Sequence, residues 1–172
     1  MNRTFPISEV AQRLIGVAMD AAYKEHHAFY EARYNSAETL VSDSIQSEKD
    51  IQDLLYVAFA EAAILMLGSE CVCPYASFVT DEMLQYARSE IPPFRKMHED
   101  VEEYVSARWS GNVDSTYKVF GIVADWLCEK LLKEPNGIAA GTFCAHFSEM
   151  KIQAISLIGD YFDDEEVTAE EG

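Results

Sequence analysis

The segment from Glu48 to Leu67 restricts the fold more than any other part of the sequence. Its first half carries apolar residues on one side of a helix, for example at Ile51, whereas its second half, YVAFAEAAILML, is apolar nearly all round. A helix of the second kind is stable only when other elements surround it. The apolar stretch is interrupted by Glu61 and is shorter than the roughly 20 residues that a membrane span needs. We therefore expect the central helix of a soluble bundle, ended by Gly68.

Apolar residues at three- and four-residue steps, the spacing of one face of a helix, recur along most of the remaining chain. We expect a first helix from Ser8, a good N-cap residue, to about Tyr34. Further helices are expected from Thr80 to the Pro92-Pro93 pair, Phe94 to Trp109, Asp114 or Ser115 to Lys133, and Ile138 to Phe162. The polar segment 37–47, anchored by Val41 and Ile45, is expected to be a short helix or an ordered loop. Residues 69–77 are expected to be irregular because the residue before Pro74 avoids helical angles.

No part of the sequence alternates between apolar and polar residues in the manner of a strand, and 172 residues fit one domain. The sequence therefore predicts an all-α fold, a single-domain bundle of five to seven helices over residues 1–162. An acidic, frayed tail is expected over residues 163–172. The last helix is expected to bury the apolar side chains of Phe143, Phe147, Ile152 and Ile155.

The charge composition limits the class of partner. The chain carries 13 basic and 30 acidic side chains, for a formal charge of −17. Direct binding to nucleic acid requires clusters of Lys and Arg, which the sequence lacks, so a partner protein with a basic surface is expected instead. The first residues hold no apolar stretch long enough for a secretory signal, and four cysteines do not make a disulfide scaffold in a chain of this size. We expect a cytoplasmic protein with reduced thiols and no membrane contact.

The acidic charge is concentrated in two blocks. The first 34 residues are neutral, residues 35–70 carry one basic and seven acidic side chains, and residues 135–172 carry one and eight. Helical positions three and four apart align along one ridge, so such carboxylates can compete for the Lys and Arg clusters that hold DNA or RNA. The candidate contact residues are Asp43, Glu48, Asp50 and Asp53 in the first block and Asp160, Asp163 and Asp164 in the second. The alternative is a solvated acidic surface without a partner.

The first predicted helix carries a row of aromatic residues. Tyr23, His27, Tyr30 and Tyr34 follow one another at steps of four, three and four residues. Residues at these steps lie on one face of a helix. Because tyrosine is favoured where proteins contact one another, we treat this row as a candidate contact face, with core packing as the alternative.

Two pairs of residues resemble zinc ligands. Cys71 lies two positions before Cys73, and Cys144 lies two positions before His146. Structural zinc sites usually have two to four residues between cysteines, and residues two apart on a helix point about 200° apart. We therefore expect buried, inert thiols at these positions and no metal or other cofactor.

A second test for metal chemistry concerns Glu99 and Glu102, which lie three apart on one predicted helix. Helical nucleotide pyrophosphohydrolases bind magnesium with two such pairs on adjacent helices. The nearest other acidic pair with this spacing, Asp160 with Asp163, falls at the end of the last helix. An exposed polar helix face explains Glu99 and Glu102 better.

Glu61 is the charged residue within the most apolar helix. An isolated buried carboxylate is costly, so Glu61 must be neutralised or paired. The expected partners are Arg13, Arg33 or His27, and the sequence does not choose among them.

No segment matches a nucleophile elbow, a phosphate-binding loop or a dinucleotide fingerprint. The sequence is best interpreted as a non-enzymatic acidic binding protein, an inhibitor that occupies the basic nucleic-acid-handling surface of a partner. Nucleic-acid mimics of phages and mobile elements act in this way against host defence, as anti-CRISPR and anti-restriction proteins. Two alternatives stay open, a toxin-neutralising immunity or antitoxin-like protein and a metal-dependent helical hydrolase. The oligomeric state is open as well.

Overall fold

A computed structural model describes residues 6–29, 41–70, 75–109, 116–134 and 137–171, and the side chains among them except those of residues 28, 29, 68–70, 116, 117 and 162–171. Within these ranges the chain forms six helices and no strand, which confirms the all-α bundle. The helices are α1 (Ile7–Phe29), α2 (Glu48–Glu70), α3 (Ala76–Glu90), α4 (Pro92–Arg108), α5 (Thr116–Leu131) and α6 (Gly137–Glu171). No described helix combines the length and the apolar character that a membrane span requires.

The apolar helix α2 is the centre of the bundle, as the sequence predicts. It packs against each of the other five helices. Most of its second half is buried, including Val57, Ala60 and Met66. The ring of Phe59 meets the ring of Phe147 from α6 edge to face, with 4.8 Å between their centroids. The burial of apolar surface around α2 is therefore the main force that holds the helices together.

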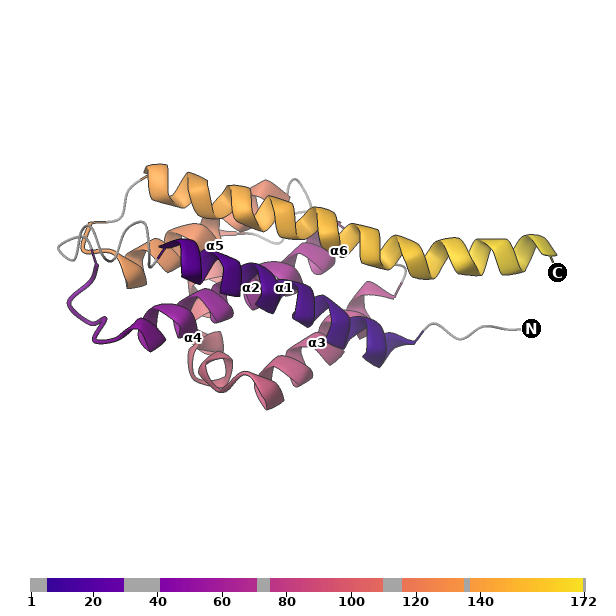
Figure 1. Cartoon of the computed structure of the whole chain (residues 1–172), viewed down its shortest axis with the longest axis horizontal. Coiled ribbons are helices and arrows are strands. Elements are labelled where there is room, and N and C mark those ends of the chain that lie inside the picture. Colours follow the sequence, from indigo (N-terminus) through magenta and orange to yellow (C-terminus); the bar gives the residue numbers. More distant parts are fainter. Residues whose placement is uncertain (1–5, 30–40, 71–74, 110–115, 135–136, 172) are drawn as a thin grey trace.

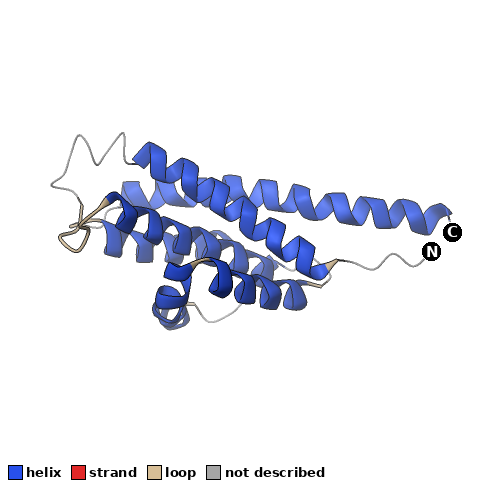
Figure 2. Ribbon diagram, turned by 60° about the horizontal axis from the view of Figure 1, so that its bottom comes forward, coloured by secondary structure: helices blue, strands red, loops and turns tan. Residues whose placement is uncertain are grey.

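Helices α1 and α6 run antiparallel and side by side along the long axis of the molecule (Figures 1 and 2). Polar contacts fix this pairing at two levels. Near the start of α1, Arg13 donates a hydrogen bond to the hydroxyl of Tyr161 over 2.9 Å, and that hydroxyl donates to Glu9 over 3.1 Å. Near its end, Glu25 lies 3.0 Å from Nδ1 of His146.

Several helix ends differ from the predictions, and the backbone of α6 continues to Glu171 instead of ending near Phe162. Helix α1 begins before Ser8, because the amide of Val10 already bonds the carbonyl of Pro6, and Ser8 Oγ instead donates to Glu82. Helix α2 continues through Gly68 to Glu70. Helix α3 begins at Ala76, four residues before the predicted cap Thr80, whose hydroxyl bonds the carbonyl of Ser77 one turn back. In α1, α2 and α3 the helical hydrogen bonds extend beyond a residue type that is common at the first or last position of a helix.

The junction between α3 and α4 follows the sequence more closely. A single extended residue, Ile91, separates α3 from α4, and the Pro92-Pro93 pair forms the first turn of α4, where a missing N–H does no harm. The predicted caps Asp114 and Ser115 lie outside the described residues. Among the described part of segment 37–47, Val41 forms an isolated bridge with Leu132, which favours the ordered loop over the short helix.

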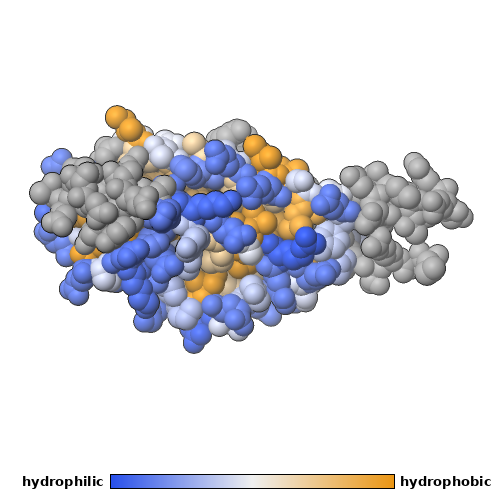
Figure 3. Space-filling model, viewed as in Figure 1, coloured by the Kyte–Doolittle hydropathy of each residue, from blue (hydrophilic) through white to orange (hydrophobic). Residues whose placement is uncertain are grey.

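The buried face of α6 is narrower than its apolar sequence suggests. Phe143 and Phe147 are fully buried, as predicted, whereas the side chains of Ile152 and Ile155 are 69% and 39% exposed, so their prediction as core residues was wrong. The face of the molecule in Figure 3 is mainly hydrophilic, with apolar residues in separate patches. The predicted frayed tail lies beyond the described side chains and stays a prediction.

Candidate functional site

Three adjoining hollows follow the exposed side of the first half of α2. The first, of about 380 Å³, lies between the end of α1 and α2. The second, of about 630 Å³, lies where these two helices meet the α3–α4 corner, and the third, of about 370 Å³, lies between α2, α4 and α5. Lys49 and Gln52 line both the first and the second hollow, and Asp53 lines both the second and the third. The three hollows therefore adjoin one another along α2, and together they are here named the α2 groove.

Negative charge and tyrosine rings characterise the lining of this groove. Its charged residues, apart from two histidines in the first hollow, are six acids and three lysines: Asp20, Glu48, Asp50, Asp53, Glu90, Asp100, Lys49, Lys96 and Lys130. Tyr23, Tyr56 and Tyr86 add three phenol rings. The groove thus offers both carboxylates and aromatic faces, the two groups that Arg and Lys side chains prefer as partners.

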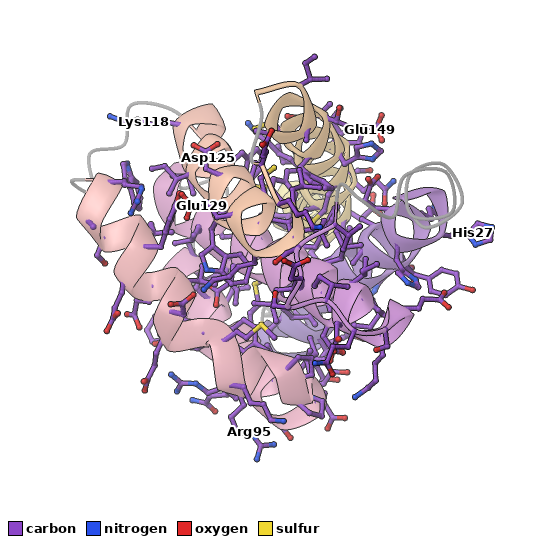
Figure 4. All side chains as sticks on the ribbon, turned by 90° about the vertical axis from the view of Figure 1, so that its left-hand side faces the viewer. His27, Arg95, Lys118, Asp125, Glu129 and Glu149 are labelled. Carbon is purple, nitrogen blue, oxygen red and sulfur yellow. The ribbon has the colours of Figure 1, made fainter. Side chains whose placement is uncertain are left out.

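The groove brings together the two features that the sequence suggested separately. Tyr23 and His27, from the aromatic row on α1, line the first hollow beside Glu48. Tyr23 is 59% exposed, so it does not pack in the core. Figure 4 shows His27 pointing away from the bundle. Tyr30 and Tyr34 lie outside the described residues.

Most of the predicted contact acids also have partners within the chain. Asp50 accepts hydrogen bonds from the amides of Gln46 and Ser47, at 2.8 and 3.2 Å, and so caps the start of α2. Asp53 lies 3.9 Å from Lys49. The pKa of Asp53 is raised, first by burial and then by the charge of Asp50, against the opposing effect of Lys49. These two carboxylates therefore support the structure of the groove and also contribute negative charge to it.

The other predicted acids divide between the rim of the groove and distant sites. Glu48 lies at the rim, 3.5 Å from Nε2 of His26. Asp43 lies outside the groove, in an ion pair of 3.1 Å with Lys133. Asp160 is exposed on α6, and the side chains of Asp163 and Asp164 are outside the described residues. The first acidic block thus contributes three of its four predicted residues to the groove, and the second block contributes none that the structure describes.

Several groove residues were not predicted from the sequence. Asp20 and Glu90 are exposed carboxylates from α1 and from the end of α3, and neither makes an ion pair with another described residue. Asp100 accepts a hydrogen bond from the indole of Trp126 over 2.8 Å and pairs with Lys130 at 3.1 Å. The indole bond, followed by Lys130, holds the pKa of Asp100 below its usual value. Only the packing of four helices places these residues next to α2, so no local sequence signal could have identified them.

A separate polar site lies on the other half of α2. The buried Glu61 bonds Nδ1 of His98 from α4, whose ring stacks on Phe94 with 5.0 Å between centroids. The described partner of Glu61 is therefore His98 and neither Arg13 nor His27, since Arg13 bonds Tyr161 and His27 lines the first hollow of the α2 groove. Arg33 lies outside the described residues. Burial raises the pKa of Glu61, and the hydrogen bond to Glu61 raises the pKa of His98. Both shifts favour the protonated forms of these two side chains.

Metal chemistry finds no support in the described part of the chain, where no three His, Cys, Asp or Glu residues are grouped so as to hold an ion. Cys71 and Cys73 lie outside the described residues. Cys144 is a free, half-buried thiol whose pKa is raised, first by burial and then by the charge of Asp125. His146 contacts Glu25 rather than this thiol.

In comparisons with protein-family models, with curated proteins and with solved structures, none matches this chain. A site in this protein is therefore identified from the geometry of the molecule itself. Its two features of functional interest are the α2 groove and the buried Glu61–His98 pair.

Proposed function

We propose that this protein is a non-enzymatic inhibitor that covers a basic, nucleic-acid-handling surface of a partner protein with its α2 groove. The observation that carries the proposal is the juxtaposition of exposed carboxylates and tyrosine rings along one groove. The exposed acids Asp20 and Glu90, which both line the second hollow, are the strongest candidates for contact with the partner's cations.

The chemistry of the groove suits Arg and Lys side chains. A guanidinium group forms paired hydrogen bonds with a carboxylate and stacks on an aromatic ring, and both kinds of group are present here. The protein itself shows the second contact, since the guanidinium of Arg108 lies 3.5 Å from the centre of the Tyr104 ring. A formal charge of −17 further speeds the encounter with a basic surface.

The rigidity of the site supports the same function. Glu48, Asp50 and Asp53 lie on helix α2, whose other side is buried in the core, so the backbone holds these three carboxylates at a fixed spacing. A surface that imitates a row of phosphates needs such fixed spacing because ordering a flexible segment on binding reduces affinity.

Charge reversal within the groove tests the proposal. The protein is used to capture partners from a lysate of its natural host, alongside a groove variant carrying Asp20→Lys and Glu90→Lys. The matched control carries Asp81→Lys and Glu149→Lys, the same charge change at exposed positions outside the groove (Figure 4 labels Glu149, on α6). We expect one basic, nucleic-acid-binding protein to be retained by the wild type and the control and lost from the groove variant. Equal retention by all three proteins would contradict the proposal, as would a captured protein without affinity for nucleic acid.

A further inference from the structure

A cavity of about 450 Å³ lies beside the Glu61–His98 pair, away from the α2 groove. Its walls come from the second half of α2, from α3 and from α4. Most of them are apolar: Ile64, Leu65, Leu84, Val101, Val105 and Trp109. This volume is within the range of pockets that hold small molecules.

The polar atoms of the cavity are arranged from its floor to its mouth. Glu61, with a side chain only 3% exposed, forms the floor, and His98 lies above it. Glu102, 65% exposed, lies at the mouth, with its carboxylate 3.6 Å from Nε2 of His98. That separation is longer than a hydrogen bond, so the Nε2–H donor and the Glu102 acceptor are each able to bond another group.

The charge of these groups limits the ligand. Nδ1 of His98 bonds Glu61, which leaves Nε2 as the ring nitrogen nearest Glu102, and the raised pKa of His98 favours the form in which Nε2 carries a proton. Nε2–H is a donor, and the Glu102 carboxylate is an acceptor. An ammonium group can donate to the Glu102 carboxylate, but it cannot accept a hydrogen bond from Nε2–H. A ligand carboxylate would be repelled by Glu102. A hydroxyl group both accepts and donates, and so it can bond both atoms.

The same geometry argues against a catalytic triad. Ser106 also lines the cavity, but it follows His98 by eight residues on α4, which corresponds to about 12 Å along the helix axis. The hydroxyl of Ser106 is therefore out of hydrogen-bond reach of the imidazole, and the histidine does not activate it. The arrangement fits recognition of a ligand better than chemistry on one.

We infer that this cavity binds a small apolar molecule that carries one hydroxyl group, such as a phenol or a short alcohol. The hydroxyl bridges Nε2 of His98 and the carboxylate of Glu102, and the apolar body lies against the aliphatic walls and Trp109. This site does not depend on the α2 groove, so the inference can be tested independently of the proposed inhibitor function.

The test is a titration of the full-length protein with para-cresol, followed by NMR at the imidazole resonances of His98. Toluene, which lacks the hydroxyl, and benzoate, which carries a negative charge, are the comparison probes. The variant Glu102→Ala removes the acceptor at an exposed position, and Glu103→Ala is the matched control on the adjacent position of α4.

We expect para-cresol to shift the His98 resonances and to bind about ten times more tightly than toluene, with no binding of benzoate. Glu102→Ala should weaken para-cresol about tenfold and leave toluene unchanged, whereas Glu103→Ala should change neither. Equal affinities for para-cresol and toluene would overturn the inference. So would an unchanged cresol affinity in Glu102→Ala, or resonance shifts that avoid His98.

Discussion

At the scale of single residues, the Glu61–His98 pair is the most unusual feature of the molecule. It places two titratable groups between apolar helices, with Phe94 against the imidazole ring and Glu102 and Arg88 as the nearest other charges. Removing one member of a buried pair of this kind is costly because the other member is left buried without a partner for its charge. Its presence makes two predictions about stability.

The first prediction concerns pH. His98 has a folded pKa above its ordinary value of 6.5, and Glu61 has a folded pKa above its ordinary value of 4.5. The folded state therefore holds more protons than the unfolded state, and the free energy of unfolding falls as the pH rises. The contribution of His98 is complete below pH 6.5 and is lost as the pH rises through its folded pKa. One proton corresponds to a slope of at most about 1.4 kcal/mol per pH unit.

Urea unfolding between pH 6 and pH 8.5 measures this dependence. The control is the double variant Glu61→Leu with His98→Leu, which removes the pair and keeps every other titrating group. Its free energy of unfolding should fall less steeply with pH than that of the wild type. Parallel slopes in the two proteins would show that the pair does not hold the extra proton.

The second prediction concerns removal of one partner. His98→Leu leaves the Glu61 carboxyl buried without its bond, and we expect it to lower the free energy of unfolding by about 3 kcal/mol. The double variant should recover much of that loss, since two leucines can pack where the pair was. Urea unfolding at pH 7 provides the comparison. If the double variant is as unstable as the single one, packing rather than the buried charge determines the loss.

At the scale of helices, α2 holds the bundle together, and Phe59 is its largest fully buried side chain. We predict that Phe59→Ala lowers the free energy of unfolding by about 3–5 kcal/mol, because it removes the contact with Phe147 and leaves a cavity. Phe78→Ala on α3, where the ring is 61% exposed, is the control and should change stability by less than about 0.5 kcal/mol. Thermal unfolding of both variants measures the difference. Similar losses would contradict the central position of α2.

The helices themselves could be predicted from the sequence, whereas several of their ends could not. Apolar periodicity extends over many residues and survives local exceptions, which is why all six helices were expected in their approximate places. A helix end depends on one or two residues, and neither Thr80 nor Gly68 stops a helix whose next turn is already supported by packing. The exposure of Ile152 and Ile155 could not be predicted either, because the width of the buried face of a helix depends on how neighbouring helices cover it.

At the scale of the whole molecule, the sequence predicted the components of the groove and not their assembly. The acidic block before and within α2 and the aromatic row on α1 were each visible as patterns. Their meeting beside Asp20, Glu90 and Tyr86 depends on how α1, α2 and the α3–α4 corner pack, and helix contacts between distant segments cannot be derived from periodicity alone. For the same reason, the sequence did not identify His98 as the partner of Glu61, 37 residues away in the chain.

The central claim is that the groove and nucleic acid compete for one basic surface. The most direct measurement is the fluorescence anisotropy of a labelled nucleic acid bound to the captured partner, titrated with this protein at 50 and 200 mM salt. We predict that the anisotropy falls to the value of the free nucleic acid at one equivalent. The Asp20→Lys, Glu90→Lys variant should need about ten times more protein, and the wild type should itself weaken at the higher salt because exposed charges are screened. An anisotropy that stays constant or rises, as in a ternary complex with the nucleic acid still bound, would contradict the claim.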